Sequence, residues 1–435
     1  MSTDVGPGPA PPPAEYVACP DCGLFQRLTE LPGPEIRQCV RCERVLAGRT
    51  AGRVDLPLAL ASCAFLLLIP AVAAPLLSVS TFGAGRTSWL STGIATFSQQ
   101  GFQTLAVLVS VSAMLLPFVY LSGLVWVLGY LHFARESAHE NASLGRIYRW
   151  VLLLRPWMML EVFLIGGFVA YTRMEAVADV TIDAGGWCLV AATFALMLAL
   201  TQVDDRTVWE ALRPREHAPR APRRAGAADP DVPGELLSGD DLACTTCDLI
   251  VPHSAEGSTC PRCKARLHRR KPDAFRRTVA LLIAGYLLYI PANLLPVLTL
   301  VRFGAEEHNT IMSGVFELIH ANLWPLAVIV FVASIVLPLT KLLGLTWMLV
   351  CIQLRSSRLL QTRTRLFRMI DLIGRWSNID VFMGSVLVAL LQFGALTTIR
   401  AGDGLVAFAA VVVITMFATV VFDPRLMWDA ARRAA

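Results

Sequence analysis

Long uncharged stretches, separated by short segments rich in arginine or proline, set the hydropathy pattern of this chain. No charged residue lies between Leu56 and Gly85, for example, or between Gly404 and Phe422. A helix that crosses a bilayer needs about 20 mostly apolar residues. The pattern therefore predicts eight membrane spans, at Leu56–Val79, Thr104–Phe133, Trp157–Tyr171, Gly185–Val203, Val279–Val301, Leu323–Cys351, Trp376–Thr397 and Leu405–Phe422.

The same pattern occurs twice along the chain. Pro291 follows Pro70 by 221 residues (291 − 70), and Pro338 follows Pro117 by the same interval. The third span has a short apolar stretch, and its pairing with the seventh span supports it. Duplicated membrane units are an architecture that transporters use.

Composition agrees with a membrane protein. Of the 435 residues, 55% are hydrophobic and only 16% are charged, which a soluble enzyme of this length would not accommodate. The net charge of +5 is spread along the chain, and no basic patch with interleaved aromatic residues points to nucleic acid.

Arginine residues predict the orientation of the spans, because cytoplasmic loops carry an excess of Lys and Arg. The segments between spans two and three and between spans six and seven hold Arg135, Arg146, Arg149, Arg155, Arg355, Arg358, Arg363, Arg365, Arg368 and Arg375. We therefore expect both termini in the cytoplasm and both halves in parallel orientation. The first apolar run starts only near Leu56, which argues against a cleavable signal peptide.

Four Cys-x-x-Cys motifs hold eight of the eleven cysteines. They precede each half in pairs, as Cys19, Cys22, Cys39 and Cys42, and as Cys244, Cys247, Cys260 and Cys263. Two such turns form a tetrahedral four-sulfur site, so we predict two structural Zn²⁺ ions, with iron as the main alternative. A redox role is the competing interpretation, but thioredoxin-type motifs do not occur as facing pairs. A closed four-cysteine site leaves no position for substrate, so it is not catalytic.

The predicted fold is an all-α polytopic membrane protein with two tandem four-helix transmembrane repeats, each preceded by a small cytoplasmic zinc-ribbon module. We divide it into a disordered N-terminus (1–15), zinc ribbon 1 (16–49), bundle 1 (56–203), a cytoplasmic linker (204–241), zinc ribbon 2 (242–270), bundle 2 (278–422) and a cytoplasmic tail (423–435).

Lys341 is the main candidate for an intramembrane functional residue. It is the only charged residue between Ala321 and Leu354, and Tyr120 takes its place in the first half. An ammonium in hydrocarbon costs about 2.5–3.5 kcal/mol. Lys341 is 14 residues from Arg355, roughly 21 Å along a helix, which makes snorkelling to the interface difficult. A place in the bundle interior is therefore favoured.

Other polar residues near the spans are weaker candidates. Asp380 is the proposed partner of Lys341, with Asn378, Ser377 and Thr340 as neutral neighbours. Asp380 and Glu161 also fit the first turns of their helices, where the helix dipole favours carboxylates. A structural role and a proton-handling role remain open for both.

Paired prolines are expected to shape the first span of each half. Pro70 and Pro75, like Pro291 and Pro296, remove backbone donors inside predicted spans and would bend or open the helices. Asn293 lies between the second pair and is a candidate for satisfying freed backbone groups. The duplication favours a cavity-forming role over simple packing kinks. After each of these spans, within 87–103 and 306–322, we expect a short amphipathic helix at the outer interface.

These features together resemble the paraquat-inducible protein A family. The resemblance rests on the paired cysteine modules, the Pro-x4-Pro first span, and the segments Pro156–Phe163 and Arg375–Phe382 (RWSNIDVF), and it covers Cys19 to about Phe422. It implies a bacterial inner-membrane protein that works with a periplasmic protein built from mammalian-cell-entry (MCE) domains to move lipids between membranes. Asn378 departs from the hydrophobic residue that family members often carry there.

The expected function is thus that of an inner-membrane subunit of an intermembrane lipid transport system. Two alternatives stay open: a non-transporting anchor for the MCE partner, and a zinc-responsive or redox-responsive membrane sensor. We expect no enzymatic activity, because the sequence has no Gly-rich phosphate loop, nucleophile elbow or His-rich metal cluster.

Overall fold

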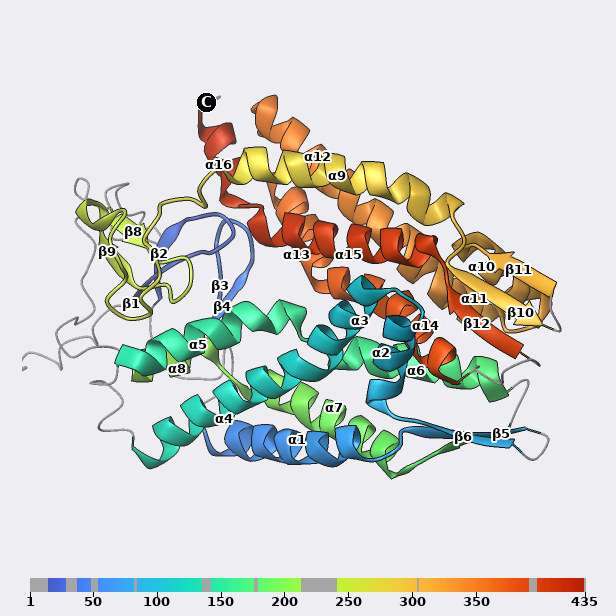
Figure 1. Ribbon diagram of the computed structural model, residues 1–435. Helices are drawn as coiled ribbons and strands as arrows, with labels where there is room; N and C mark the ends of the chain where they lie inside the picture. Colours follow the sequence, from blue (N-terminus) through green and yellow to red (C-terminus); the bar gives the residue numbers. More distant parts are fainter. Residues whose placement is uncertain are drawn as a thin grey trace, which may run out of the picture.

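The computed structural model describes residues 15–28, 37–47, 54–81, 84–134, 142–175, 179–212, 241–302, 305–390 and 397–433. Residues 1–14 of the predicted disordered N-terminus and most of the predicted linker lie outside these ranges, whereas Glu15 begins strand β1. In the described part, helices dominate both halves, and short strands form the cysteine modules and two small sheets (Figure 1). The predicted helical membrane fold in two tandem repeats is confirmed.

The first half contains α1 (Asp55–Ala73), β5 (Leu77–Thr81), β6 (Ala84–Ser88), α2 (Leu90–Gln99), α3 (Gln103–Val109), the π-helix η1 (Ser110–Leu115), α4 (Leu116–Phe133), α5 (Ala142–Leu154), the 3-10 turn η3 (Arg155–Trp157), α6 (Leu160–Glu175), β7 (Asp179–Ile182), α7 (Ala184–Gln202) and α8 (Asp205–Ala211).

The second half repeats this order with α9 (Ala274–Leu294), β10 (Leu298–Arg302), β11 (Ala305–Asn309), α10 (Ile311–His320), α11 (Trp324–Phe331), η5 (Val332–Val336), α12 (Leu337–Gln353), α13 (Leu360–Ile373), η6 (Gly374–Asn378), α14 (Ile379–Leu390), β12 (Thr397–Ala401), α15 (Asp403–Val421) and α16 (Arg425–Arg432). Each element of one half thus has a counterpart in the other, as the sequence repeat predicts.

Seven helical segments of the described chain are long and apolar enough to cross a membrane. The predicted seventh span is not among them. Its helix, α14, has 12 described residues, about 18 Å of helix against a hydrocarbon core of about 30 Å, and residues 391–396 of the predicted span lie outside the described chain. It packs beside its counterpart α6, which continues from α5 through η3 as a segment of 30 residues.

The first span of each half is shorter than predicted. Helices α1 and α9 end at Ala73 and Leu294, so Pro75 and Pro296 follow the helices instead of bending them. The prediction that both prolines of each pair lie inside a span is therefore wrong. Their carbonyl oxygens accept hydrogen bonds from Gly185 N and Gly404 N, both at 3.0 Å, at the start of α7 and α15.

Two small antiparallel sheets, which the all-helical prediction missed, follow these prolines. The strand order is β6-β5-β7 in one and β11-β10-β12 in the other. In Figure 1 both sheets lie at the right-hand end of the molecule, while the strands of the cysteine modules lie at the left. The two halves therefore point the same way. The predicted short helices after each first span are present as α2 and α10.

Each half also has a π-helical turn within its second span. Pro117 and Pro338 follow η1 and η5 closely and donate no backbone hydrogen bond. Leu116 N and Leu337 N bond instead to carbonyls five residues back, those of Val111 and Val332. The helix thus accommodates each proline with a wider turn.

The halves meet where α6 crosses α14. Phe163 and Phe382 pack edge to face with ring centroids 5.5 Å apart, and Asn378 Nδ2 lies 2.7 Å from Met159 Sδ. Both pairs join equivalent positions of the repeat, 219 residues apart (382 − 163 and 378 − 159). Equivalent residues touch one another only beside a local twofold axis. The axis of the repeat therefore passes through this crossing.

The described segments directly after the two bundles form helices. The predicted linker begins with α8, where Trp209 is buried and packs against Tyr148 of α5. The predicted tail forms α16, where Trp428 is buried. Both helices lie at the end that carries the cysteine modules, and α16 takes part in the contacts described next.

Candidate metal centres and intramembrane polar site

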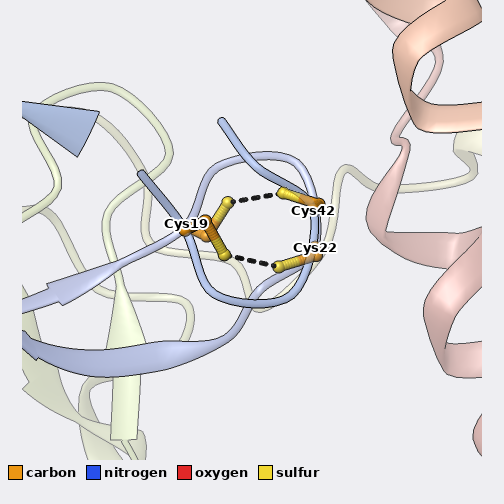
Figure 2. A group of neighbouring side chains, drawn as sticks. Cys19, Cys22 and Cys42 are labelled. Carbon is orange, nitrogen blue, oxygen red and sulfur yellow. Dashed lines mark hydrogen bonds between the residues drawn. The ribbon is translucent and has the colours of Figure 1, made fainter. Parts of the chain in front are cut away.

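The first cysteine module is a pair of hairpins that face each other. Strands β1 (Glu15–Ala18) and β2 (Phe25–Leu28) flank one Cys-x-x-Cys turn, and β3 (Arg37–Gln38) and β4 (Val45–Ala47) flank the other. Cys19 Sγ lies 3.4 Å from Cys42 Sγ, and Cys22 Sγ lies 3.6 Å from Cys39 Sγ (Figure 2). All four side chains are buried.

The second module has the same geometry on β8 (Asp241–Ala243), β9 (Ile250–Pro252) and the loop that follows. Cys244 Sγ lies 3.5 Å from Cys263 Sγ, and Cys247 Sγ lies 3.6 Å from Cys260 Sγ. In both modules the residue after the second cysteine of each motif has positive φ, at Gly23, Glu43, Asp248 and Lys264. The left-handed backbone conformation of this residue lets each turn fold back beside the metal position.

The two clusters fit a tetrahedral metal ion. In each, the four sulfur atoms lie within 4.8 Å of one another. Zn–S bonds of about 2.3 Å place tetrahedral sulfurs about 3.8 Å apart, close to the observed pairs. The eight cysteines predicted as ligands are therefore brought together in two groups of four. Four sulfurs would complete the coordination shell of one tetrahedral ion, as in structural zinc sites.

The first module docks on the second half of the protein. Arg368 of α13 donates to Asp21 Oδ2 at 2.5 Å and to the Cys42 carbonyl at 2.8 Å. Arg425, the first residue of α16, donates from Nε to the Pro20 carbonyl at 2.9 Å. The Arg41 guanidinium lies 4.2 Å from the ring centroid of Trp428. Arg365 also pairs with Glu43.

The second module docks on the first half, so the modules are exchanged. Arg149 of α5 donates to the Lys264 carbonyl at 2.8 Å. Arg149 and Arg368 are equivalent positions of the repeat (368 − 149 = 219). Gly145 of α5 approaches the Arg262 carbonyl so closely that a Cβ there would overlap it. Each module thus contacts the half that it does not precede, in both cases through an arginine at equivalent positions of the repeat.

An ion pair joins the second module to the C-terminal helix. Arg270 donates to both carboxylate oxygens of Asp429, at 2.6 and 2.9 Å. Burial alone would raise the pKa of the Asp429 carboxyl. Hydrogen bonds and charge from Arg270 and Arg432 outweigh burial and lower this pKa. Because the pKa is lowered, the ion pair stabilises the folded state at a pH above the ordinary carboxyl pKa. This stabilisation is lost as the pH falls through the pKa of the folded state.

Arg368→Ala should release the first module from the second half. Asp21 is 4% exposed as a side chain, and a hydrogen bond to a charged group contributes about 1.5–3 kcal/mol. We expect faster hydrogen exchange in 15–47 and 360–373, with unchanged exchange in the second module. Arg365→Ala, which removes a more exposed ion pair, is the matched control and should change exchange much less. Equal effects of the two variants would contradict this contact as the main link.

The intramembrane lysine lies in the interior of the second half. Lys341 of α12 is 2% exposed, and its Nζ donates to the Gly374 carbonyl at 2.5 Å and lies 3.5 Å from Thr415 Oγ1 of α15. Thr340, Lys341 and Gly374 line a cavity of about 20 Å³. The Lys341 ammonium is therefore held by backbone and hydroxyl oxygens of two other elements, as expected for a bundle-interior lysine.

The predictions for the polar residues near Lys341 and for Asn293 differ in how they compare with the structure. Ser377 and Asn378 are buried, and within the described chain Ser377 Oγ and Asn378 Oδ1 have no hydrogen-bond partner. Asp380 is the second residue of α14, and its side chain lies outside the description, so its pairing with Lys341 stays a prediction. Glu161 lies in the first turn of α6, as the dipole argument expects. Asn293 donates to the Tyr289 carbonyl at 2.8 Å, so it bonds to the backbone of its own helix.

Comparison with known proteins decides the family. The sequence profile described as "Paraquat-inducible protein A" matches residues 54–213 and 275–432, one region in each half. The chain belongs to the paraquat-inducible protein A family. The match confirms the resemblance inferred from the repeated motifs, and its two regions coincide with the two structural repeats.

The family's curated relatives match along almost the whole chain. "Intermembrane transport protein PqiA" of Escherichia coli (strain K12) is 27% identical over 418 residues, 96% of each chain. "Lipophilic envelope-spanning tunnel protein A" of the same organism is 29% identical over 427 residues, 96% of this chain and 92% of the relative. A "probable intermembrane transport protein" of Haemophilus influenzae is 24% identical over 421 residues. No solved structure matches the chain.

Proposed function

We propose that this protein is the inner-membrane subunit of a lipid transport system that connects two membranes. Relatives matched over 96% of the chain are named for intermembrane transport. The periplasmic partner that we propose is a protein built from MCE domains, as the family resemblance implies. The proposal assigns no enzymatic step to this chain.

One observation carries the transport role: a buried ammonium within a membrane helix bundle. Lys341 contacts Gly374 and Thr415 instead of the aqueous interface. Ionisable residues at such depth are costly and typically serve a pathway or a proton relay. Three elements meet around it, and a change in its charge would alter how α12, η6 and α15 pack. Lys341 is thus proposed to couple protonation to movement of the second half.

The metal in each module is proposed to be structural zinc. The four thiolates would hold the ion, which supplies folding energy to a module too small for an apolar core of its own. Because each module docks on the opposite half, the ion also stabilises a connection between the halves. We place the modules and both termini in the cytoplasm, because the arginine-rich segments lie at the same end of the spans.

A non-transporting anchor is the second candidate function. The sheets β6-β5-β7 and β11-β10-β12 lie opposite the cysteine modules and offer a surface for a periplasmic partner. A protein that only anchors the partner needs this surface but does not need a buried lysine. Lys341 therefore favours transport over anchoring. A zinc or redox sensor has no comparable support, since closed four-sulfur sites are typical of structural zinc.

Co-purification from native membranes tests the proposal. The tagged full-length protein should retain a periplasmic MCE-domain protein, identified by mass spectrometry, together with phospholipid that persists after extensive detergent washing. A tagged membrane protein of similar size and unrelated function is the control for carry-over lipid. Recovery of neither the partner nor excess lipid would contradict the proposed system.

A further inference from the structure

A cavity of about 120 Å³ lies in the first half, beside the α6–α14 crossing. Its lining comes from α2, α6, α7 and α14 and from the strand segment after Pro75; it includes Leu164, Gly167, Leu189, Val386 and Ala389. No lining residue of this cavity, among those described, carries a formal charge. An apolar wall selects a hydrocarbon ligand over a polar one.

The cavity lies along the outer part of a membrane span. Leu164, Gly167, Phe168 and Tyr171 line it from one face of α6, and the seven residue steps from the first to the last (171 − 164) cover about 10 Å of helix. Phe168 is exposed on the side that would face lipid. Tyr171 and Trp89 lie toward the sheet, where amphipathic aromatic rings typically mark the membrane interface. The cavity therefore opens toward the lipid of the bilayer.

One glycine of α6 accounts for open space in the wall of this cavity. A Cβ added to Gly167 would meet no atom within 4 Å. The equivalent position of the repeat is Val386 (386 − 167 = 219). The absence of a side chain at Gly167 thus leaves space that a larger residue at this position would fill.

We propose that this cavity binds part of one acyl chain of a membrane phospholipid, with the headgroup near Trp89 and Tyr171. The proposal rests on the proposed transport function and adds where the lipid is held. In this proposal the first half binds lipid, and the second half contains the buried lysine. The α6–α14 crossing joins the two, because Val386 and Ala389 of α14 form part of the cavity wall.

Photolabelling of the full chain in vesicles tests the site. The vesicles contain phosphatidylethanolamine and phosphatidylglycerol with a trace of phosphatidylethanolamine that carries a diazirine on one acyl chain. Val386 and Ala389 are 7% and 1% exposed, so bulk lipid does not reach them. We expect adducts at these two residues, and a tenfold or greater loss of them in Gly167→Leu.

Two controls make the result specific. Gly129→Leu changes a glycine of α4 whose added Cβ also has room, and it should keep the adducts. Adducts at Leu198, an exposed residue of α7, should be the same in all variants and report bulk lipid. Absence of adducts at Val386 and Ala389, or their persistence in Gly167→Leu, would overturn the site. Labelling by a diazirine free fatty acid alone would overturn the phospholipid assignment.

The outcome is separable from that of the transport proposal. The adducts report binding in purified protein, whereas transport is measured in cells. Cavity labelling that Gly167→Leu abolishes, together with absence of lipid exchange in cells, would support the site and contradict transport. Full activity of Gly167→Leu in cells without cavity labelling would overturn the cavity as part of the transport route.

Discussion

Lys341→Met should abolish complementation of an envelope-lipid defect while the protein inserts and accumulates normally. The substitution keeps the length of the side chain and removes the charge. Because a buried ammonium costs about 2.5–3.5 kcal/mol in the membrane, the variant should be at least as resistant to thermal unfolding as the wild type. Loss of function with unchanged or higher stability is the signature of a functional residue that is maintained at a cost in stability.

Leu343→Ala on the same helix is the matched control, since Leu343 is 54% exposed toward the lipid side. It should complement fully. Asp380→Asn should reproduce the loss, and the double variant should be little worse than either single one if the two residues act as a unit. Full activity of Lys341→Met at normal abundance would refute the proposed coupling. Retained binding of the periplasmic partner by this variant would separate transport from anchoring.

Cys19→Ser together with Cys22→Ser should remove one of two metal equivalents from the purified protein. Metal binding supplies about 10–16 kcal/mol to small zinc modules, so residues 15–47 should unfold and lose their contacts with α13 and α16. Elemental analysis gives the metal content, and hydrogen exchange reports the loss of structure in the module and on the facing surface of the second half.

Cys63→Ser is the control, because Cys63 lies on α1 outside both clusters. It should retain two equivalents and normal exchange. The second module should keep its metal in the double variant, since its four sulfurs are untouched. Well-folded wild-type protein without two equivalents of zinc or iron would contradict the metal assignment.

The local features of the metal clusters and the repeat were predictable from sequence, because they depend on short spacings. A Cys-x-x-Cys turn brings its own two sulfurs together, and a constant interval of 221 or 219 residues pairs the elements of the halves. The exchanged docking of the modules was not predictable. Asp21 and Arg368 are 347 residues apart, and neither carries a local signal that names its partner.

The predicted boundaries of the first spans were wrong for a different reason. Leu77 and Val79 extend the apolar run beyond α1, but they belong to strand β5. Hydropathy measures transfer from water and does not distinguish a helix from a buried strand over so few residues. Pro75 was the available signal, since a proline after a helix often marks its end. The cavity in the first half also escaped notice, although the contrast between Gly167 and Val386 was present in the repeat.

Phospholipid exchange between the inner and outer membranes tests the central claim most directly. Cells that lack the gene receive the wild-type protein, Lys341→Met or an empty vector, and a pulse of labelled phospholipid is followed in separated membranes. The account predicts that exchange changes on deletion, returns with the wild-type protein and does not return with Lys341→Met. Identical exchange in all three strains, with the proteins present at equal levels, would contradict it.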